Sequence, residues 1–142
     1  MHNYPEENDY NFKIDLACNI SRISNNSLSL SVSDDSYTGG PRPNTSITTL
    51  NFLFNPERLA SLDDIIDYSS YPEFAKNMIE RYGSVEQKDF LKDHLDIPYY
   101  PNSFLLTEES IELVLLEGLP RYMMTLAFLE IPIKDLKLKV EI

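Results

Sequence analysis

The side chains of this chain that could carry out chemistry are mostly carboxylates, and two of them, Asp34 and Asp35, are adjacent. Two carboxylates at a suitable separation can hydrolyse a glycosidic bond. The chain has 23 acidic residues, however, so neighbouring acids are expected from composition alone. We therefore interpret this pair as turn residues, and a carboxylate-based glycan hydrolase is the third of three hypotheses for function.

Three further acids, Asp63, Asp64 and Asp67, gather where a helix is expected to start. Cation binding is one reading of such a group. Negative charge at this end of a helix also complements the helix dipole, and this simpler explanation accounts for all three. The sequence accordingly predicts no metal site here.

Nucleophilic chemistry has few candidate residues. Cys18 is the single cysteine, and the two histidines are His2 and His94. We expect Cys18 to be a buried thiol because it falls in an alternating strand pattern, and a Cys-His pair would require it to leave that strand. No phosphate-binding loop or dinucleotide motif is present. We predict that the protein is not an enzyme and has no cofactor.

Two segments are better suited to recognition. In the first, Tyr37 precedes Gly39-Gly40, and prolines flank Arg42. Glycine reaches backbone angles closed to other residues and proline fixes φ, so this segment predicts a shaped loop. In the second, Tyr122 follows Pro120. Tyrosine offers a flat apolar ring and a hydroxyl to a partner. The predicted ligand-binding residues are Tyr37, Gly39, Gly40, Arg42, Pro120 and Tyr122; alternatively, the two tyrosines pack as strand-end residues.

Charge narrows the class of partner. The formal net charge is −11, which disfavours nucleic acid and anionic membranes and favours a basic protein. No stretch approaches the roughly 20 apolar residues of a membrane span, so we predict no membrane insertion by this chain. The sequence does not predict the oligomeric state.

The elements that must position these residues follow the order strands, helices, strands. Residues 1–11 are expected to be a flexible acidic arm and residues 12–142 a single α+β domain. Apolar residues alternate over 12–20 and 28–32, and Ser24-Asn25-Asn26 is expected to form a turn between the two runs. This pattern predicts a hairpin with its apolar face buried and its serine-rich face in solvent. A third strand is expected over 46–54.

Three helix starts are marked by a hydroxyl followed three residues later by an acid or amide: Ser61 with Asp64, Ser70 with Glu73, and Ser84 with Gln87. Gly83 is expected to be a left-handed C-cap. Strands are then expected over 104–106, 111–116, 122–133 and 136–142. The predicted fold class is α+β, an antiparallel or mixed sheet with two to three helices packed on one face.

Three patches in order carry a resemblance: residues 28–40 followed by the strand 48–54, residues 59–66, and residues 102–111 with 119–122 and 130–136. Together they resemble an extracytoplasmic family of unknown function. This family forms the C-terminal domain of RsiV-type lysozyme-sensing anti-sigma factors and accompanies PdaC-type peptidoglycan deacetylases. The resemblance implies a mixed sheet with helices on one side, a location outside the cytoplasmic membrane, and binding instead of catalysis.

The leading hypothesis is therefore a non-enzymatic extracytoplasmic recognition domain. Its ligand would be a basic protein such as lysozyme, or peptidoglycan or another cell-wall glycan. The second hypothesis is an intracellular acidic inhibitor or immunity-type protein that covers a basic surface. It rests on the net charge and on the absence of a signal peptide from the sequence, which leaves a cytoplasmic location open.

Overall fold

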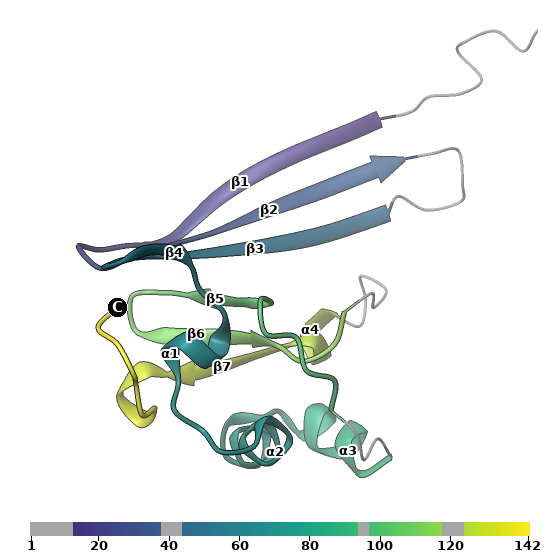
Figure 1. Cartoon of the computed structure of the whole chain (residues 1–142). Coiled ribbons are helices and arrows are strands. Elements are labelled where there is room, and N and C mark those ends of the chain that lie inside the picture. The colour runs from purple at the N-terminus through teal and green to yellow at the C-terminus, as the bar shows by residue number, and fades with distance from the viewer. Residues whose placement is uncertain (1–12, 38–43, 94–96, 118–123) are drawn as a thin grey trace, which may run out of the picture.

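The computed structural model describes residues 13–37, 44–93, 97–117 and 124–142, and it confirms an α+β fold (Figure 1). Four strands come first, three helices follow, and a second group of strands completes the described chain. The strands form two antiparallel sheets, one with the order β1-β2-β3-β4 and one with the order β5-β6-β7. The expected arm, residues 1–11, lies outside the described residues.

The first sheet contains three long strands and one short one: β1 (Lys13–Ile23), β2 (Ser27–Tyr37), β3 (Asn44–Phe54) and β4 (Glu57–Leu59). The predicted hairpin between β1 and β2 is confirmed. Its turn is held by Ser24, whose Oγ accepts hydrogen bonds from the N–H groups of Asn26 (3.1 Å) and Ser27 (3.0 Å). Such side-chain bonds to the nearby backbone are typical of serine in turns.

The three predicted helices are α1 (Leu62–Ile65), α2 (Tyr71–Tyr82) and α3 (Val85–Asp93). Two of the helix starts have the predicted bonds. The Asp64 carboxylate accepts from the Ser61 N–H at 2.9 Å. The Gln87 side chain accepts from the Ser84 N–H at 2.9 Å, while Ser84 Oγ accepts from the Gln87 N–H at 3.1 Å.

Two helix-end predictions are wrong in detail. Ser70 occupies the N-cap position of α2, but its side chain makes no capping hydrogen bond. Gly83 follows α2 with φ −68° and ψ 153°, which is extended backbone and not the left-handed conformation. Its N–H still bonds to the Ile79 carbonyl at 2.7 Å, so the chain leaves the helix directly and needs no left-handed residue.

The second sheet consists of β5 (Phe104–Leu106), β6 (Ser110–Val114) and β7 (Phe128–Pro132), with the short helix α4 (Met124–Ala127) before β7. The predicted strand over 122–133 therefore begins with a helical turn in its described part. The predicted strand over 136–142 is wrong. The 3₁₀ turn η3 (Ile133–Asp135) redirects the chain, and one isolated bridge joins Leu138 to Ile66.

The core lies between the second sheet and the helices, with α2 packed against β7 (Figure 1). Its fully buried side chains share one face of β5–β7 or point inward from α1, α2 and the segments around them; the largest are Phe104, Leu62, Ile65, Ile66, Ile79, Leu106, Ile111, Leu113, Leu129 and Ile131. From β1, β2 and β3 the core receives Leu53. These three long strands therefore stand largely outside the hydrophobic core.

Candidate functional site

The first sheet turns its polar face toward the rest of the molecule, opposite to the sequence prediction. Ser27 and Ser29 in β2 and Asn51 in β3 are buried, whereas Leu30 and Leu50 on the other face are partly exposed. Strand β5 lies against the polar face and contacts β1, β2 and β3. The expectation of a buried apolar face and a solvated serine face is wrong.

The physical reason is that β5 is an edge strand whose backbone needs hydrogen-bond partners. Ser29 Oγ accepts from the Leu106 N–H at 2.9 Å and donates to Asn51 Oδ1. Asn51 Nδ2 in turn donates to the Phe104 carbonyl at 2.8 Å. Hydroxyl and amide side chains thus take the place of a neighbouring strand, and an apolar face could not supply those bonds.

Two further contacts extend this junction. Ser21 Oγ donates to the Leu106 carbonyl at 2.7 Å, and Thr49 Oγ1 donates to the Asn102 carbonyl at 2.7 Å. Arg22 fastens the end of β1: its Nη1 donates to the carbonyls of Thr107 (2.7 Å) and Glu108 (3.0 Å), and its Nη2 donates to the Ile142 carbonyl at 2.9 Å.

The opposite side of the first sheet carries an apolar surface that spans all three long strands near the β1–β2 turn and continues along β1 beyond it. We call its apolar residues the apolar face. Cross-strand neighbours build it in rows: Ile20 lies beside Leu30, which lies beside Leu50, and Leu28 lies between Ile23 and Phe52. Residues of one parity share a face of a strand. The apolar face comprises Ile14, Leu16, Cys18, Ile20, Ile23, Leu28, Leu30, Val32, Leu50 and Phe52. Polar residues lie beside it on the outer half of the same side of β2 and β3: Asp34, Ser36, Ser46 and Thr48.

Much of this surface is open to solvent. Ile14 and Leu16 are each 68% exposed, Ile20 57% and Ile23 75%. Figure 1 shows the helices and the second sheet gathered on one side of β1–β3, and the far ends of these strands diverge from that body. From the row of Ile23 to the row of Cys18, six residues at 3.4 Å each and three strands 4.8 Å apart give an area of roughly 300 Å². This is at the lower end of the range for the largest apolar patch on a typical monomer, and such patches often have a function.

The candidate catalytic residues are not brought together. Cys18 is exposed on the apolar face and is not the buried thiol expected from the sequence. Asp34 and Asp35 lie within β2, not in a turn, and successive strand residues point to opposite faces. They therefore do not form a paired-carboxylate site. In the described part of the chain, no group of three or more His, Cys, Asp or Glu residues could hold a metal ion. His2 and His94 lie outside that part.

The acids near α1 have protein partners. Asp63 accepts hydrogen bonds from the hydroxyls of Tyr68 and Tyr99, and Lys137 Nζ lies 2.9 Å from the Asp67 carboxylate. Burial, and then the bond to Asp63, raise the pKa of Tyr68 above its usual value. The bond to Lys137 lowers the pKa of Asp67. This cluster joins the start of the helical region to later parts of the chain, so its acids have a structural explanation.

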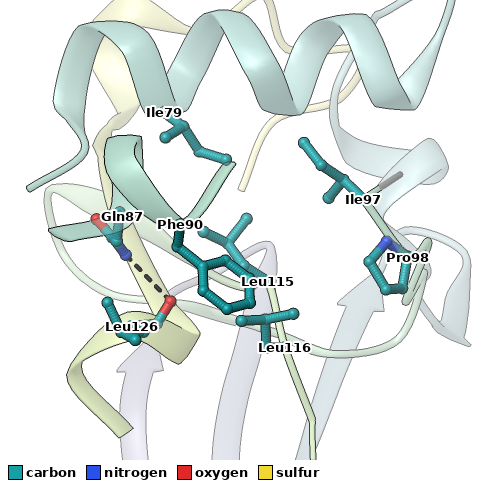
Figure 2. A pocket seen from close by; sticks show the side chains of 8 residues that line it. All are labelled: Ile79, Gln87, Phe90, Ile97, Pro98, Leu115, Leu116 and Leu126. Carbon is teal, nitrogen blue, oxygen red and sulfur yellow. Dashed lines mark hydrogen bonds between the residues drawn. The ribbon is translucent and has the colours of Figure 1, made fainter. Parts of the chain in front are cut away.

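A small apolar pocket lies under α2 and α3 (Figure 2). Its cavity volume of about 20 Å³ is room for little more than one water molecule. The side-chain amide of Gln87, which is the polar group in its wall, is already hydrogen-bonded: its Nε2 donates to the carbonyls of Leu126 (3.3 Å) and Phe128 (2.7 Å). The lining residues are Ile79, Gln87, Phe90, Ile97, Pro98, Leu115, Leu116 and Leu126. This pocket is a packing void and not a substrate site.

The predicted recognition residues fall at the limits of the structure. Gly39, Gly40, Arg42, Pro120 and Tyr122 lie outside the described residues. Tyr37 is the last residue of β2, and β3 begins at Asn44, so the Gly-Gly segment joins the far ends of these two strands. The apolar face was missed as a binding surface because its alternation was interpreted as a sign of burial.

Comparison with known proteins adds no family. The chain matches no protein-family model, and no curated protein matches it. The resemblance to the lysozyme-sensing family therefore stays a prediction. Within the described ranges, no helix has the length and apolar character needed to cross a membrane.

Proposed function

We propose that this protein is a non-enzymatic recognition module that binds a protein partner through the apolar face. The observation that carries the proposal is the orientation of the first sheet: apart from Leu53 and Ile47 in β3, the large aliphatic side chains of the three long strands point away from the molecule's own core. Covering such side chains is worth about 25 cal/mol for each Å² removed from water. A partner that covers this face therefore gains a driving force that the fold itself does not use.

The chemistry of the face favours a protein over a sugar. Apart from Cys18, its residues are isoleucine, leucine and valine together with the aromatic Phe52. Aliphatic side chains suit close packing against the apolar core of a protein interface. They provide few of the flat aromatic rings and hydrogen-bonding groups that would orient a glycan.

The charge of the chain favours a basic partner. A net charge of −11 attracts a basic protein and speeds its encounter with the apolar face. The resemblance to lysozyme sensors points the same way, and we carry it into the proposal: the partner is a basic, extracytoplasmic protein of lysozyme type.

The proposal is tested by calorimetric titration with a C-type lysozyme at low and raised salt, using three proteins. These are the wild type, the double variant Ile20→Gln/Leu30→Gln, and the control Ile47→Gln. Ile20 and Leu30 are cross-strand neighbours at the centre of the apolar face. Ile47 is also exposed, but it pairs with Ser33 on the opposite face.

We expect saturable binding by the wild type that weakens with salt. Burying one large aliphatic side chain is worth about 1.5–3 kcal/mol, so the double variant should lose at least tenfold in affinity, and the control should lose little. Absence of binding at both salt concentrations would exclude a lysozyme-type partner. Equal losses in the double variant and the control would exclude the apolar face as the site.

A further inference from the structure

Strand β1 has an unusually open outer edge. It is the first strand of the sheet and pairs on one side with β2; in the described part of the chain, no strand pairs with its other side. The strand is eleven residues long, and Lys13 to Ile20 are all exposed. Proteins usually shorten, cover or interrupt such edges, because a row of free N–H and C=O groups can pair with another strand. Here the register is regular from Lys13 to Ile20, and its shift comes between Ile20 and Arg22.

In the regular part of β1, the order of apolar and polar residues is the same when the strand is read from either end. Around Ala17, apolar Leu16 and Cys18 occupy matching positions. Polar Asp15 and Asn19 match one step further out, and Ile14 matches Ile20 beyond them. An antiparallel pairing of two such strands, centred on Ala17, therefore places apolar residues opposite apolar residues and Asp15 opposite an asparagine.

Charge also permits a second copy at this edge. The whole chain carries −11, but β1 contains Lys13, Arg22 and a single acid, Asp15, for a local charge of +1. In the pairing centred on Ala17, no two like charges stand directly opposite each other, an arrangement that would be destabilising. Two molecules that are acidic overall can therefore contact each other at this edge without local charge repulsion.

We propose that two copies of this chain pair antiparallel through the outer edges of β1, about a two-fold axis at Ala17. The two first sheets become one continuous sheet, and because residues of the same parity meet, the two apolar faces join on one side. This inference deepens the proposed function, because it turns two separate faces into a single larger binding platform.

The dimer is expected to be weak. Seven regular residue pairs give about seven main-chain hydrogen bonds. A strand edge about 25 Å long buries less than the roughly 1,000 Å² typical of stable interfaces. The association should therefore be measured at tens to hundreds of micromolar.

Disulfide trapping tests the pairing directly. Cα atoms of residues directly opposite in an antiparallel pair lie about 4.5–5.5 Å apart, inside the range that a disulfide spans. Ala17→Cys in a Cys18→Ser background should form a disulfide dimer upon mild oxidation. In the same register, the two copies of Cys18 are offset by two residues and lie about 8 Å apart, too far for easy bridging.

The matched control is Asn19→Cys in the same Cys18→Ser background. Residue 19 is exposed and shares a face with Ala17, but its two copies are offset by four residues, roughly 14 Å. We expect rapid trapping at position 17, slow trapping at Cys18 and none at position 19. Equal trapping at all three positions would indicate random collision and overturn the pairing; faster trapping at Cys18 than at position 17 would overturn this register.

Charge reversal gives a second test that needs no oxidation. Ala17→Asp and Ala17→Lys each place two like charges on the axis, so each variant alone should sediment as a monomer, and their mixture should form a heterodimer. A wild type that stays monomeric at several hundred micromolar would overturn the inference.

The outcomes for the dimer and for the proposed function are separable, because Ala17 lies on the opposite side of the sheet from the apolar face. If the wild type is monomeric and still binds lysozyme, the dimer proposal is excluded and the proposed function stands. If the wild type dimerises and binds no lysozyme, the lysozyme-type partner is excluded and the dimer stands.

Discussion

The junction between the two sheets makes a quantitative prediction at Ser29. Its side chain is fully buried, accepts a hydrogen bond from the Leu106 N–H at 2.9 Å and donates to Asn51 Oδ1. Ser29→Ala leaves both of these buried groups without that partner. The alanine itself fits, because the change removes one oxygen atom and adds nothing.

The expected cost follows from the two groups left behind. An unsatisfied buried donor or acceptor costs about 1–3 kcal/mol. Two such groups, with some relaxation of the amide, place the loss for Ser29→Ala at about 2–4 kcal/mol. At the roughly 2–4 °C per kcal/mol expected for a chain of this size, the melting temperature should fall by about 5–15 °C.

The matched control is Ser31→Ala. Ser31 is two residues further along β2 on the same face, but it is only partly buried, and its hydroxyl makes none of the described hydrogen bonds. A change at such a position usually stays within about 0.5 kcal/mol. Urea unfolding followed by far-ultraviolet circular dichroism measures both variants. Equal stability losses at Ser29 and Ser31 would refute the claim that side-chain bonds to β5 join the sheets.

Two further changes test other parts of the fold. Gly83→Ala should destabilise the protein by about 1–3 kcal/mol, because an added Cβ would lie 2.4 Å from the Ile79 carbonyl oxygen. Its control in the same urea assay is Asn77→Ala, a change at an exposed position of α2. A Gly83→Ala variant as stable as the wild type would contradict the close approach. Glu112→Gln should stabilise the protein at pH 7 by about 0.5 kcal/mol, because Glu112 stands opposite Glu130 in the sheet. Burial, and then the charge of Glu130, raise the pKa of Glu112 above 4.5, so the folded state prefers the protonated form and the wild type loses stability as pH rises through the window above 4.5. The gain in melting temperature of Glu112→Gln over the wild type should therefore be smaller at pH 4 than at pH 7. An equal gain at both pH values would contradict this assignment.

Local signals in the sequence predicted local structure well. The pair Ser84 and Gln87 predicted a helix start, and the reciprocal bonds between them are present. Ser24 and the asparagines after it predicted the first hairpin turn. Both predictions succeeded because the bonds that decide them join residues no more than three positions apart.

Predictions that depended on distant partners were less successful. Leu136, Leu138, Val140 and Ile142 alternate like a strand, yet the chain forms one bridge, at Leu138. Alternation shows that one side of a segment is apolar, but a strand also needs a free neighbouring edge. Here the N–H of Lys139 bonds to the Ile65 carbonyl at 2.8 Å, and the N–H of Asp67 bonds to the Lys137 carbonyl at 2.9 Å. The tail is thus held beside the end of α1.

The orientation of the first sheet shows why the candidate site could not be predicted from alternation. The pattern at Leu28, Leu30 and Val32 correctly indicated two unlike faces, but it did not indicate which face meets the body of the protein. That choice is made by β5, whose edge presents backbone groups that Ser29 and Asn51 can bind and leucine cannot.

The polar junction and the apolar face lie on opposite sides of the first sheet, and the position of one determines the position of the other. Once Ser29, Thr49 and Asn51 are committed to the junction, the strict alternation of strand side chains sends Leu30 and Leu50 outward. The outward orientation of the apolar face therefore follows geometrically from the joining of the two sheets through polar side chains. Reversing it would bury the same leucines against unpaired backbone groups, at about 1–3 kcal/mol for each group. A partner that covers this face can thus gain its burial energy without competing with the bonds that hold the two sheets together.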